Sequence, residues 1–273
     1  MSNEERKQPN EDPQAIGSIL RDLGQRLIPR MRAFERSLRE VAKAAEPYLA
    51  NLLENIKTLS DRTSAVQQTL AQRGWFIPPK VPAITFLNLV EKHSAAGRMK
   101  ELDELMTTYV DSQVSIIEAD LIARYPNRAA LFEEAFKAHR LEMYASAVTI
   151  LLSQADGICI DSLGQKFFSM ETVKGGVKQP KTKRVIQSYG AGVLQEMMLQ
   201  PLLSGSGMGA SEEEQSSYSD SLNRHTVMHG IDTTYPSKMN SAKAISLVAY
   251  LGGVAQEIIE KMKLGSTPGL FAD

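Results

Sequence analysis

The chain has 273 residues, of which 42% are hydrophobic, 23% are charged and 6% are aromatic, and its formal net charge is -1. This length allows one large domain or two small ones, each with a hydrophobic core. The near-zero charge excludes a uniformly basic surface, so any contact with nucleic acid must be local. The single cysteine, Cys159, excludes an intrachain disulfide and favours a reducing compartment, and we expect its thiol to be buried.

Residues 1–13 mix charged and polar side chains without an apolar segment, which predicts a disordered tail and no signal peptide. No apolar run approaches the ~18 residues that a membrane-spanning helix needs. We therefore expect a cytoplasmic protein that does not contact a membrane.

Residues 14–73 carry apolar side chains every three or four positions, which predicts an amphipathic, coiled-coil-like helical arm. Pro29 and Pro47 fall inside this arm and are expected to kink or break it. Two roles stay open for the arm, namely packing against the rest of the chain and holding partner subunits. The repeating apolar positions are Phe34, Leu38, Val41, Ala45, Leu49, Leu52, Ile56 and Leu59.

Residues 74–82 contain three prolines and the only tryptophan, Trp75, which predicts a proline-rich linker whose apolar residues pack on the core. Residues 83–264 then predict a helical domain, and 265–273 a C-terminal tail. Helix-forming residues dominate and long alternating β-branched stretches are missing, so we expect an all-α fold. The predicted helices are 83–96, 99–125, 128–154 with Asn127 as its cap, the apolar core helix 145–160 ending near Gly157, 186–203, and 237–264. Loops are expected over 164–184, which is basic, and over 204–217.

The densest chemical signal is the stretch 222–230, which holds Arg224, His225 and His229, two of the four histidines of the chain. Arginine is a permanent cation suited to phosphate, and histidine titrates near neutral pH, so together they suit phosphodiester chemistry without a metal. His225 and His229 share a helix face, whereas Arg224 and His229 point roughly 140° apart on an ideal helix. Three arrangements would bring Arg224 and His229 to one phosphate: a distorted helix end at Gly230, an arginine side chain that wraps round the helix, or a second copy of the chain that supplies the other half of the site.

Arg224-His225-Thr226-Val227-Met228-His229 matches the R-x4-6-H pattern, and over residues 130–262 the chain resembles HEPN-domain proteins of bacterial defence systems. The resemblance implies a HEPN-like helical bundle that acts as a metal-independent endoribonuclease without a cofactor. It also implies a homodimer or higher homo-oligomer and a toxin or anti-phage setting, in which an antitoxin or regulatory partner controls the activity. In that reading His229 is the general acid or base, Arg224 stabilises charge on the phosphoryl oxygens, and His225 orients the phosphate or shares in proton transfer.

The RNA is expected to contact basic and polar residues around this motif. Attack by the ribose 2′-OH would leave a 2′,3′-cyclic phosphate and a 5′-hydroxyl. The predicted RNA-binding residues are Asn223, Lys178, Lys181, Lys183, Arg184 and Tyr235.

Two rival interpretations stay open. The i, i+4 spacing of His225 and His229 also suits a metal, but no glutamate follows the first histidine and Asp232 is the nearest carboxylate, so no metal is expected. His93 and His139 lie among residues of helical pattern and are expected at the surface or at the edge of the core, and no Ser/His/Asp triad is apparent. The other interpretation is a non-enzymatic interaction or sensor subunit that keeps the HEPN-like fold and binds a partner through its N-terminal arm.

Overall fold

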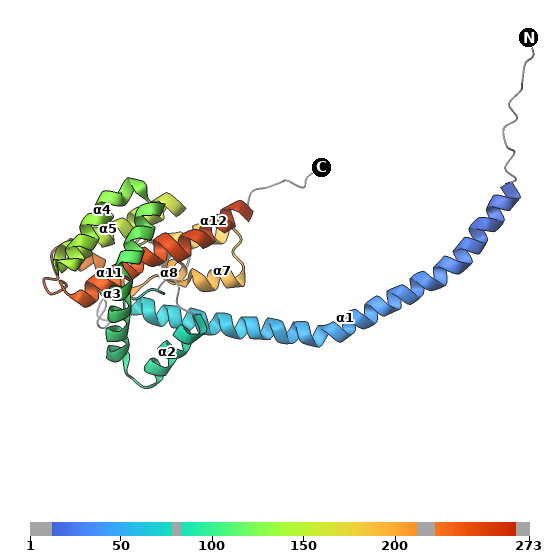
Figure 1. Ribbon diagram of the computed structural model, residues 1–273, viewed down its shortest axis with the longest axis horizontal. Helices are drawn as coiled ribbons and strands as arrows, with labels where there is room; N and C mark the ends of the chain where they lie inside the picture. The colour runs from blue at the N-terminus through green and yellow to red at the C-terminus, as the bar shows by residue number, and fades with distance from the viewer. Residues whose placement is uncertain (1–12, 78–82, 212–221, 266–273) are drawn as a thin grey trace, which may run out of the picture. The chain divides into compact units, whose positions relative to one another are not determined.

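The computed structural model describes residues 13–77, 83–211 and 222–265 and confirms the all-α prediction (Figure 1). Two three-residue strands are the only sheet within these ranges. The contacts of the chain divide it into two units, Met1–Lys57 and Thr58–Asp273. The predicted tails 1–13 and 265–273 lie outside the described residues, except that Pro13 begins helix α1 and Gly265 ends helix α12.

Helix α1 (Pro13–Gln72) is one unbroken helix, so a break at Pro29 or Pro47, one of the two expected outcomes, was wrong, and a kink stays a prediction. An interior proline removes one backbone hydrogen bond and crowds the preceding turn, which can kink a helix without ending it. In the second unit, the last turns of α1 bury Val66, Leu70 and Ala71 in the core. This part of the predicted arm therefore belongs to the folded domain, and the boundary between the units precedes the linker.

The residues after α1 pack on the core, as predicted. Gly74 adopts a positive φ of 81°, which turns the chain away from the helix axis. Trp75 is fully buried and its Nε1 donates a hydrogen bond to Asp103 Oδ1 at 2.8 Å. The buried Phe76 ring stacks on Tyr250 with ring centroids 5.7 Å apart. Residues 78–82, with the three prolines, lie outside the described residues.

The domain is a bundle in which α11 packs against α3 and α5, and α4 packs against α3 and α5 (Figure 1). Helix α11 is buried around most of its circumference, which is typical of a central core helix. The helices that follow the linker are α2 (Ala83–Ala95), α3 (Met99–Arg124), the 3-10 turn η1 (Pro126–Arg128), α4 (Ala129–Arg140) and α5 (Tyr144–Leu163).

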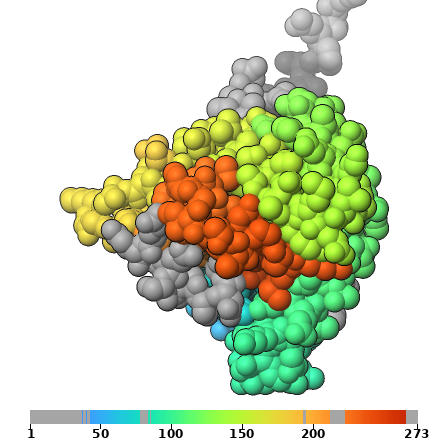
Figure 2. Space-filling view, turned by 90° about the vertical axis from the view of Figure 1, so that its left-hand side faces the viewer, coloured from blue at the N-terminus to red at the C-terminus, as the bar shows by residue number. Residues whose placement is uncertain are grey.

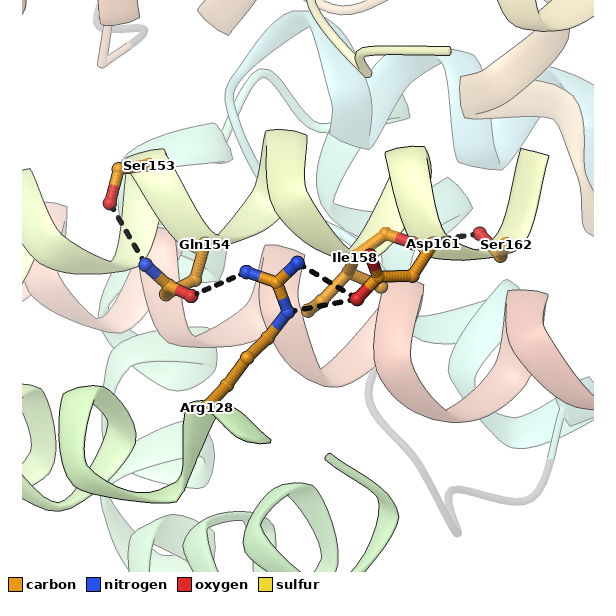
Figure 3. Close-up of polar contacts among 6 residues, drawn as sticks. All are labelled: Arg128, Ser153, Gln154, Ile158, Asp161 and Ser162. Carbon is orange, nitrogen blue, oxygen red and sulfur yellow. Dashed lines mark hydrogen bonds and ion pairs between the residues drawn. The ribbon is translucent and has the colours of Figure 1, made fainter. Parts of the chain in front are cut away.

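The helix predicted over 128–154 is divided into α4 and α5, because Glu142 takes a positive φ of 60° between them. Asn127 lies inside η1 and does not cap α4. Helix α5 also continues past Gly157, where helix termination was predicted. The side chain of Arg128 crosses α5 at this glycine and bonds Gln154 Oε1 and Asp161 Oδ2 (Figure 3). An added Cβ would stand 2.3 Å from Arg128 Nη1, so the glycine makes room for the guanidinium.

The predicted basic loop contains a hairpin of strands β1 (Met170–Thr172) and β2 (Lys178–Pro180), which pair antiparallel. The helix predicted over 186–203 is three shorter helices, because Gly190 takes a positive φ of 68° and interrupts it. These helices are α6 (Lys181–Ser188), α7 (Val193–Met198) and α8 (Gln200–Ser204), and the 3-10 turn η2 (Gly207–Gly209) follows them. The rest of the loop predicted over 204–217 lies mostly outside the described residues.

The last predicted helix is confirmed in extent and consists of α11 (Lys238–Ala249), the π-helical segment η3 (Tyr250–Ala255) and α12 (Gln256–Gly265). Ser237 caps it by accepting a hydrogen bond from Asn240 N. By length and composition alone, the stretch Lys238–Leu264 could cross a membrane, which the sequence analysis did not find, but 78% of its most apolar window is buried inside the protein. Such burial is typical of the core helix of a soluble protein.

Candidate functional site

The Arg/His motif forms the short helix α10 (Arg224–Met228), and Asn223 positions it. Asn223 Oδ1 accepts hydrogen bonds from His225 N at 2.8 Å and Thr226 N at 3.1 Å, while its Nδ2 donates to Ala210 O at 2.9 Å. The side chain is buried, with 1% of the residue exposed. Asn223 therefore acts as a helix cap that ties α10 to η2, which leaves it no surface with which to contact RNA.

The two histidines of the motif lie together on one face of α10. Their ring centroids are 4.3 Å apart and the rings are inclined by 68°. His225 is partly buried and His229 is exposed, and Gly230 ends the helix with a positive φ of 70°. The i, i+4 spacing has thus produced the shared face that helical geometry predicts.

The Arg224 side chain contacts Phe168 and Asp156 and does not pair with His229, as its position on the helix predicts. Its guanidinium lies 5.7 Å from the centre of the Phe168 ring, and Nη2 is 3.5 Å from Asp156 Oδ2. Asp156 is mostly buried and its Oδ1 also accepts a hydrogen bond from Phe168 N at 3.2 Å. Asp156 thus holds both the arginine and the backbone of the segment beneath it. The Arg224 side chain is 32% exposed, so part of it can contact a ligand.

An open pocket of about 600 Å³ lies beside α10 and brings three of the predicted site residues together. Arg224 and His225 line it from α10, and Lys178 lines it from strand β2. Phe168 and Met170 supply its apolar surface, and η2 supplies a further part of its wall. In Figure 2 the orange surface that includes α10 lies beside the projecting yellow surface of the hairpin segment. Three basic side chains from two separate segments therefore meet around one hollow.

The other predicted RNA-binding residues do not line this pocket. Lys181 and Lys183 are partly buried on α6, and Arg184 is exposed there with its Nη1 3.9 Å from Glu171 Oε2. The Tyr235 ring packs on the core, with its hydroxyl 3.4 Å from Thr149 Oγ1. Tyr235 therefore fastens the segment before α11 onto α5, which agrees with the packing role that aromatic residues near helix ends commonly have.

No group of three metal-ligating side chains occurs in the described part of the chain. Asp232, the carboxylate nearest in sequence to the two histidines, accepts hydrogen bonds from Thr234 N and Oγ1 at 2.7 and 2.8 Å. This carboxylate thus closes a local turn. Among the described residues the two histidines therefore lack the further ligands of a metal site, which usually has three or more from the protein.

A second polar cluster, which the sequence did not reveal, joins α3, α4 and α11. His139 Nδ1 lies 2.7 Å from Ser241 Oγ, and its Nε2 lies 3.1 Å from Asp111 Oδ1, whose other oxygen pairs with Lys238 Nζ at 2.8 Å. Burial lowers the pKa of His139, and Asp111 opposes this effect only in part. Ser241 is completely buried, so its hydroxyl cannot reach a substrate. The cluster links the three helices, and His139, which was expected at the surface or at the edge of the core, is buried within it.

Cys159 has the buried position predicted for it, whereas His93 was expected at the surface or at the edge of the core. Both are buried, and His93 Nδ1 lies 2.8 Å from Leu89 O. Burial raises the pKa of the Cys159 thiol far above its ordinary value, so the thiol stays protonated. A protonated, buried thiol is a poor nucleophile.

Asp156, Phe168 and Met170 were not predicted as site residues. Asp156 carried a signal, because an acidic residue within the most apolar stretch of the chain must find a partner when it is buried. No feature of the sequence marked Phe168 and Met170 as site residues, because both are ordinary apolar residues of a predicted loop.

Comparison of the chain with protein-family models, with curated proteins and with solved structures finds no match in any of the three.

Proposed function

We propose that this protein is a metal-independent endoribonuclease whose site is built from Arg224, His225 and His229. The observation that carries the proposal is the pairing of two histidine rings 4.3 Å apart, next to a pocket that Arg224, His225 and Lys178 share. Two adjacent imidazoles can divide the roles of base and acid, and the neighbouring cations can hold a phosphate. The motif resemblance to HEPN-domain proteins supports the same reaction.

In the proposed reaction one histidine accepts the proton of the ribose 2′-OH, and the oxygen attacks the adjacent phosphorus. His229, the more exposed ring, protonates the leaving 5′-oxygen, so that the products are a 2′,3′-cyclic phosphate and a 5′-hydroxyl. Arg224 offsets the negative charge that builds on the phosphoryl oxygens. Because the nucleophile is the 2′-OH, the substrate is RNA.

The divergence of Arg224 and His229 supports a site shared between two copies of the chain. The Arg224 guanidinium contacts Asp156 and Phe168, whereas the His229 ring packs against the His225 ring. In a two-fold dimer, Arg224 of one protomer can serve the same phosphate as His229 of its partner. This arrangement gives two composite sites for each dimer.

The first test is cleavage of a 5′-labelled RNA by the purified full-length chain in the presence of EDTA. We expect cleavage that leaves a 2′,3′-cyclic phosphate, and a loss of roughly 100-fold or more for His229→Ala and for Arg224→Ala. Arg98→Ala is the matched control, because Arg98 is an exposed arginine whose ion pair among the described residues is with the exposed Glu101. Absent cleavage, cleavage that requires a metal, or unchanged rates in both site variants would refute the proposal.

The second test mixes the two inactive variants after they are unfolded and refolded together. A composite site predicts that Arg224→Ala and His229→Ala complement each other, because one site of each mixed dimer is intact. The expected recovery is roughly a quarter of the wild-type rate, since about half of the dimers are mixed. No recovery would show that both residues act within one chain.

A second candidate function is a non-enzymatic interaction subunit, and the first unit favours it. In that unit α1 exposes apolar side chains that most soluble proteins cover, namely Tyr48 (80% exposed), Leu49 (57%), Leu52 (54%) and Leu53 (66%). Leu38 and Val41, which were predicted to continue this face, have side chains outside the described residues. The interaction function predicts that Leu49→Glu and Leu52→Glu abolish the biological activity while His229→Ala leaves it intact, with Asn51→Asp as the control. Loss of the biological activity in His229→Ala, with the activity kept in Leu49→Glu and Leu52→Glu, would favour the nuclease.

A further inference from the structure

A groove of about 670 Å³ is lined by α3 on one side and by the continuous helix of α11, η3 and α12 on the other. We call it the α3 groove, and it shares no lining residue with the pocket beside α10. Its apolar part carries Ile116 of α3, which is 49% exposed, and Ala249 and Gly253 of the facing helix. An apolar groove between two helices is a surface on which a further helix can pack.

Gly253 keeps the α3 groove open. A Cβ at this position would meet nothing within 4 Å in the described part of the chain, and its φ is not positive, so neither packing nor the backbone requires a glycine. Gly253 also lies in the π-helical segment η3, and π-helical turns frequently occur at functional sites. The missing side chain therefore leaves room that a residue of another molecule can fill.

One end of the α3 groove is charged. Asp120 and Glu257 lie four residues beyond Ile116 and Gly253, and both pair with Arg124, at 3.0 and 2.8 Å. The two carboxylate side chains are 50% and 54% exposed, and two carboxylates with one guanidinium sum to a net charge of -1. One further cation at this end would balance the charges, so the end favours a basic side chain.

In the first unit, α1 carries a stripe of the complementary chemistry. Leu49, Leu53 and Lys57 follow one another at intervals of four residues and share one face of the helix. Leu49 and Leu53 are 57% and 66% exposed, and Lys57 is exposed as well. We call these three residues the arm stripe.

The arm stripe matches the α3 groove in order and in length. Along both, apolar positions are followed by a charged position, which is basic in the stripe and acidic in the groove. Lys57 comes eight residues after Leu49, and Glu257 comes eight residues after Ala249. Eight residues of helix span about 12 Å. The stripe therefore fits the groove in chemistry and in size.

We propose that the arm stripe of one copy of the chain docks in the α3 groove of a second copy. Leu49 and Leu53 cover the apolar part of the groove, with Leu53 over Gly253, and Lys57 lies against Glu257 and Asp120. An amphipathic helix in an apolar groove is a common mode of recognition, in which residues one turn apart act as anchors. The inference concerns assembly and does not rest on the proposed nuclease activity.

A disulfide trapped between two full-length variants tests which surfaces meet. One variant carries Leu53→Cys and a tag that changes its size, and the other carries Gly253→Cys; the native Cys159 is buried. After mixing and oxidation we expect a covalent product of the two chains on a non-reducing gel, because a disulfide forms only between close Cβ atoms. Leu141→Cys is the matched control in place of Gly253→Cys, because Leu141 is 59% exposed and lies outside the groove. The control should give little of the mixed product.

The charged end is tested by exchanging the charges, with association measured by sedimentation velocity. Lys57→Glu and Glu257→Lys should each weaken association roughly fivefold, because each places like charges together. The two substitutions combined should restore most of the affinity. Glu260→Lys is the control, because Glu260 is exposed on the same helix and does not line the groove, and it should leave association unchanged.

Gly253→Leu should weaken association about tenfold, because its side chain fills the groove. If this variant fails to fold, as judged by circular dichroism, the charge exchange carries the test. Three results would overturn the inference: a strictly monomeric full-length chain, a product of Leu53→Cys with itself in place of the mixed product, or no recovery in the combined charge variant. The second of these would show that the arms pair with each other.

Discussion

The clearest prediction from the site concerns Asn223, which the motif suggested as an RNA contact and the structure uses as a cap. Replacing it with alanine removes three hydrogen bonds, two accepted from His225 N and Thr226 N and one donated to Ala210 O. Because the side chain is 1% exposed, water cannot replace these bonds without opening the fold. We therefore expect a loss of stability together with a loss of the α10 geometry.

The size of the effect follows from two contributions. Loss of an N-cap side chain costs roughly 0.5–2 kcal/mol. Leaving the buried Ala210 carbonyl without its donor costs roughly 1–3 kcal/mol. Asn223→Ala should thus lower the free energy of unfolding by about 2–4 kcal/mol, which corresponds to a fall in Tm of roughly 5–15 °C for a domain of this size.

Differential scanning calorimetry measures this change, and Asn223→Asp is the informative control. Aspartate keeps the acceptor that caps α10 but loses the donor to Ala210 and buries a charge, so it should be destabilised as well, through a different bond. A variant Asn223→Ala with an unchanged Tm and weakened RNA binding would refute the structural role and restore the original expectation.

Two further predictions test the bundle. Burial holds the pKa of His139 below its ordinary value of 6.5, so the folded chain binds fewer protons than the unfolded chain and stability should fall as the pH drops through this value. The urea concentration at the unfolding midpoint should therefore decrease as the pH is lowered from about 7.5 to about 5.5, and it should decrease less in His139→Gln. Equal decreases in the wild type and in His139→Gln would contradict this role of His139. Gly157→Ala should lower the free energy of unfolding by about 1 kcal/mol, because its methyl group displaces the Arg128 guanidinium. In an Arg128→Ala background the same substitution should raise the free energy of unfolding by about 1 kcal/mol, because alanine favours a helix more than glycine does. If urea unfolding shows that Gly157→Ala changes the free energy of unfolding in the same direction in both backgrounds, the contact between Gly157 and Arg128 is contradicted.

The secondary structure followed closely from the sequence where a helix depends on its own periodicity. The helices around 83–96 and 99–125 and the final helix beginning after Ser237 lie within a few residues of their predicted bounds. The predictions failed where one residue or one distant contact decides the outcome. Glu142 interrupts a periodic stretch with a positive φ, and Gly157 lies within helix α5, where its missing side chain leaves room for Arg128.

In the candidate site, too, local features could be predicted from the sequence and contacts between distant residues could not. The shared face of His225 and His229 and the divergence of Arg224 follow from helical geometry within six residues, and the sequence alone determined both. Only the tertiary structure placed Asp156, Phe168 and Lys178 around Arg224, and only it joined His139 to Asp111 and Ser241. The physical reason is that helix spacing is set by local backbone geometry, whereas contacts between distant residues depend on how the helices pack.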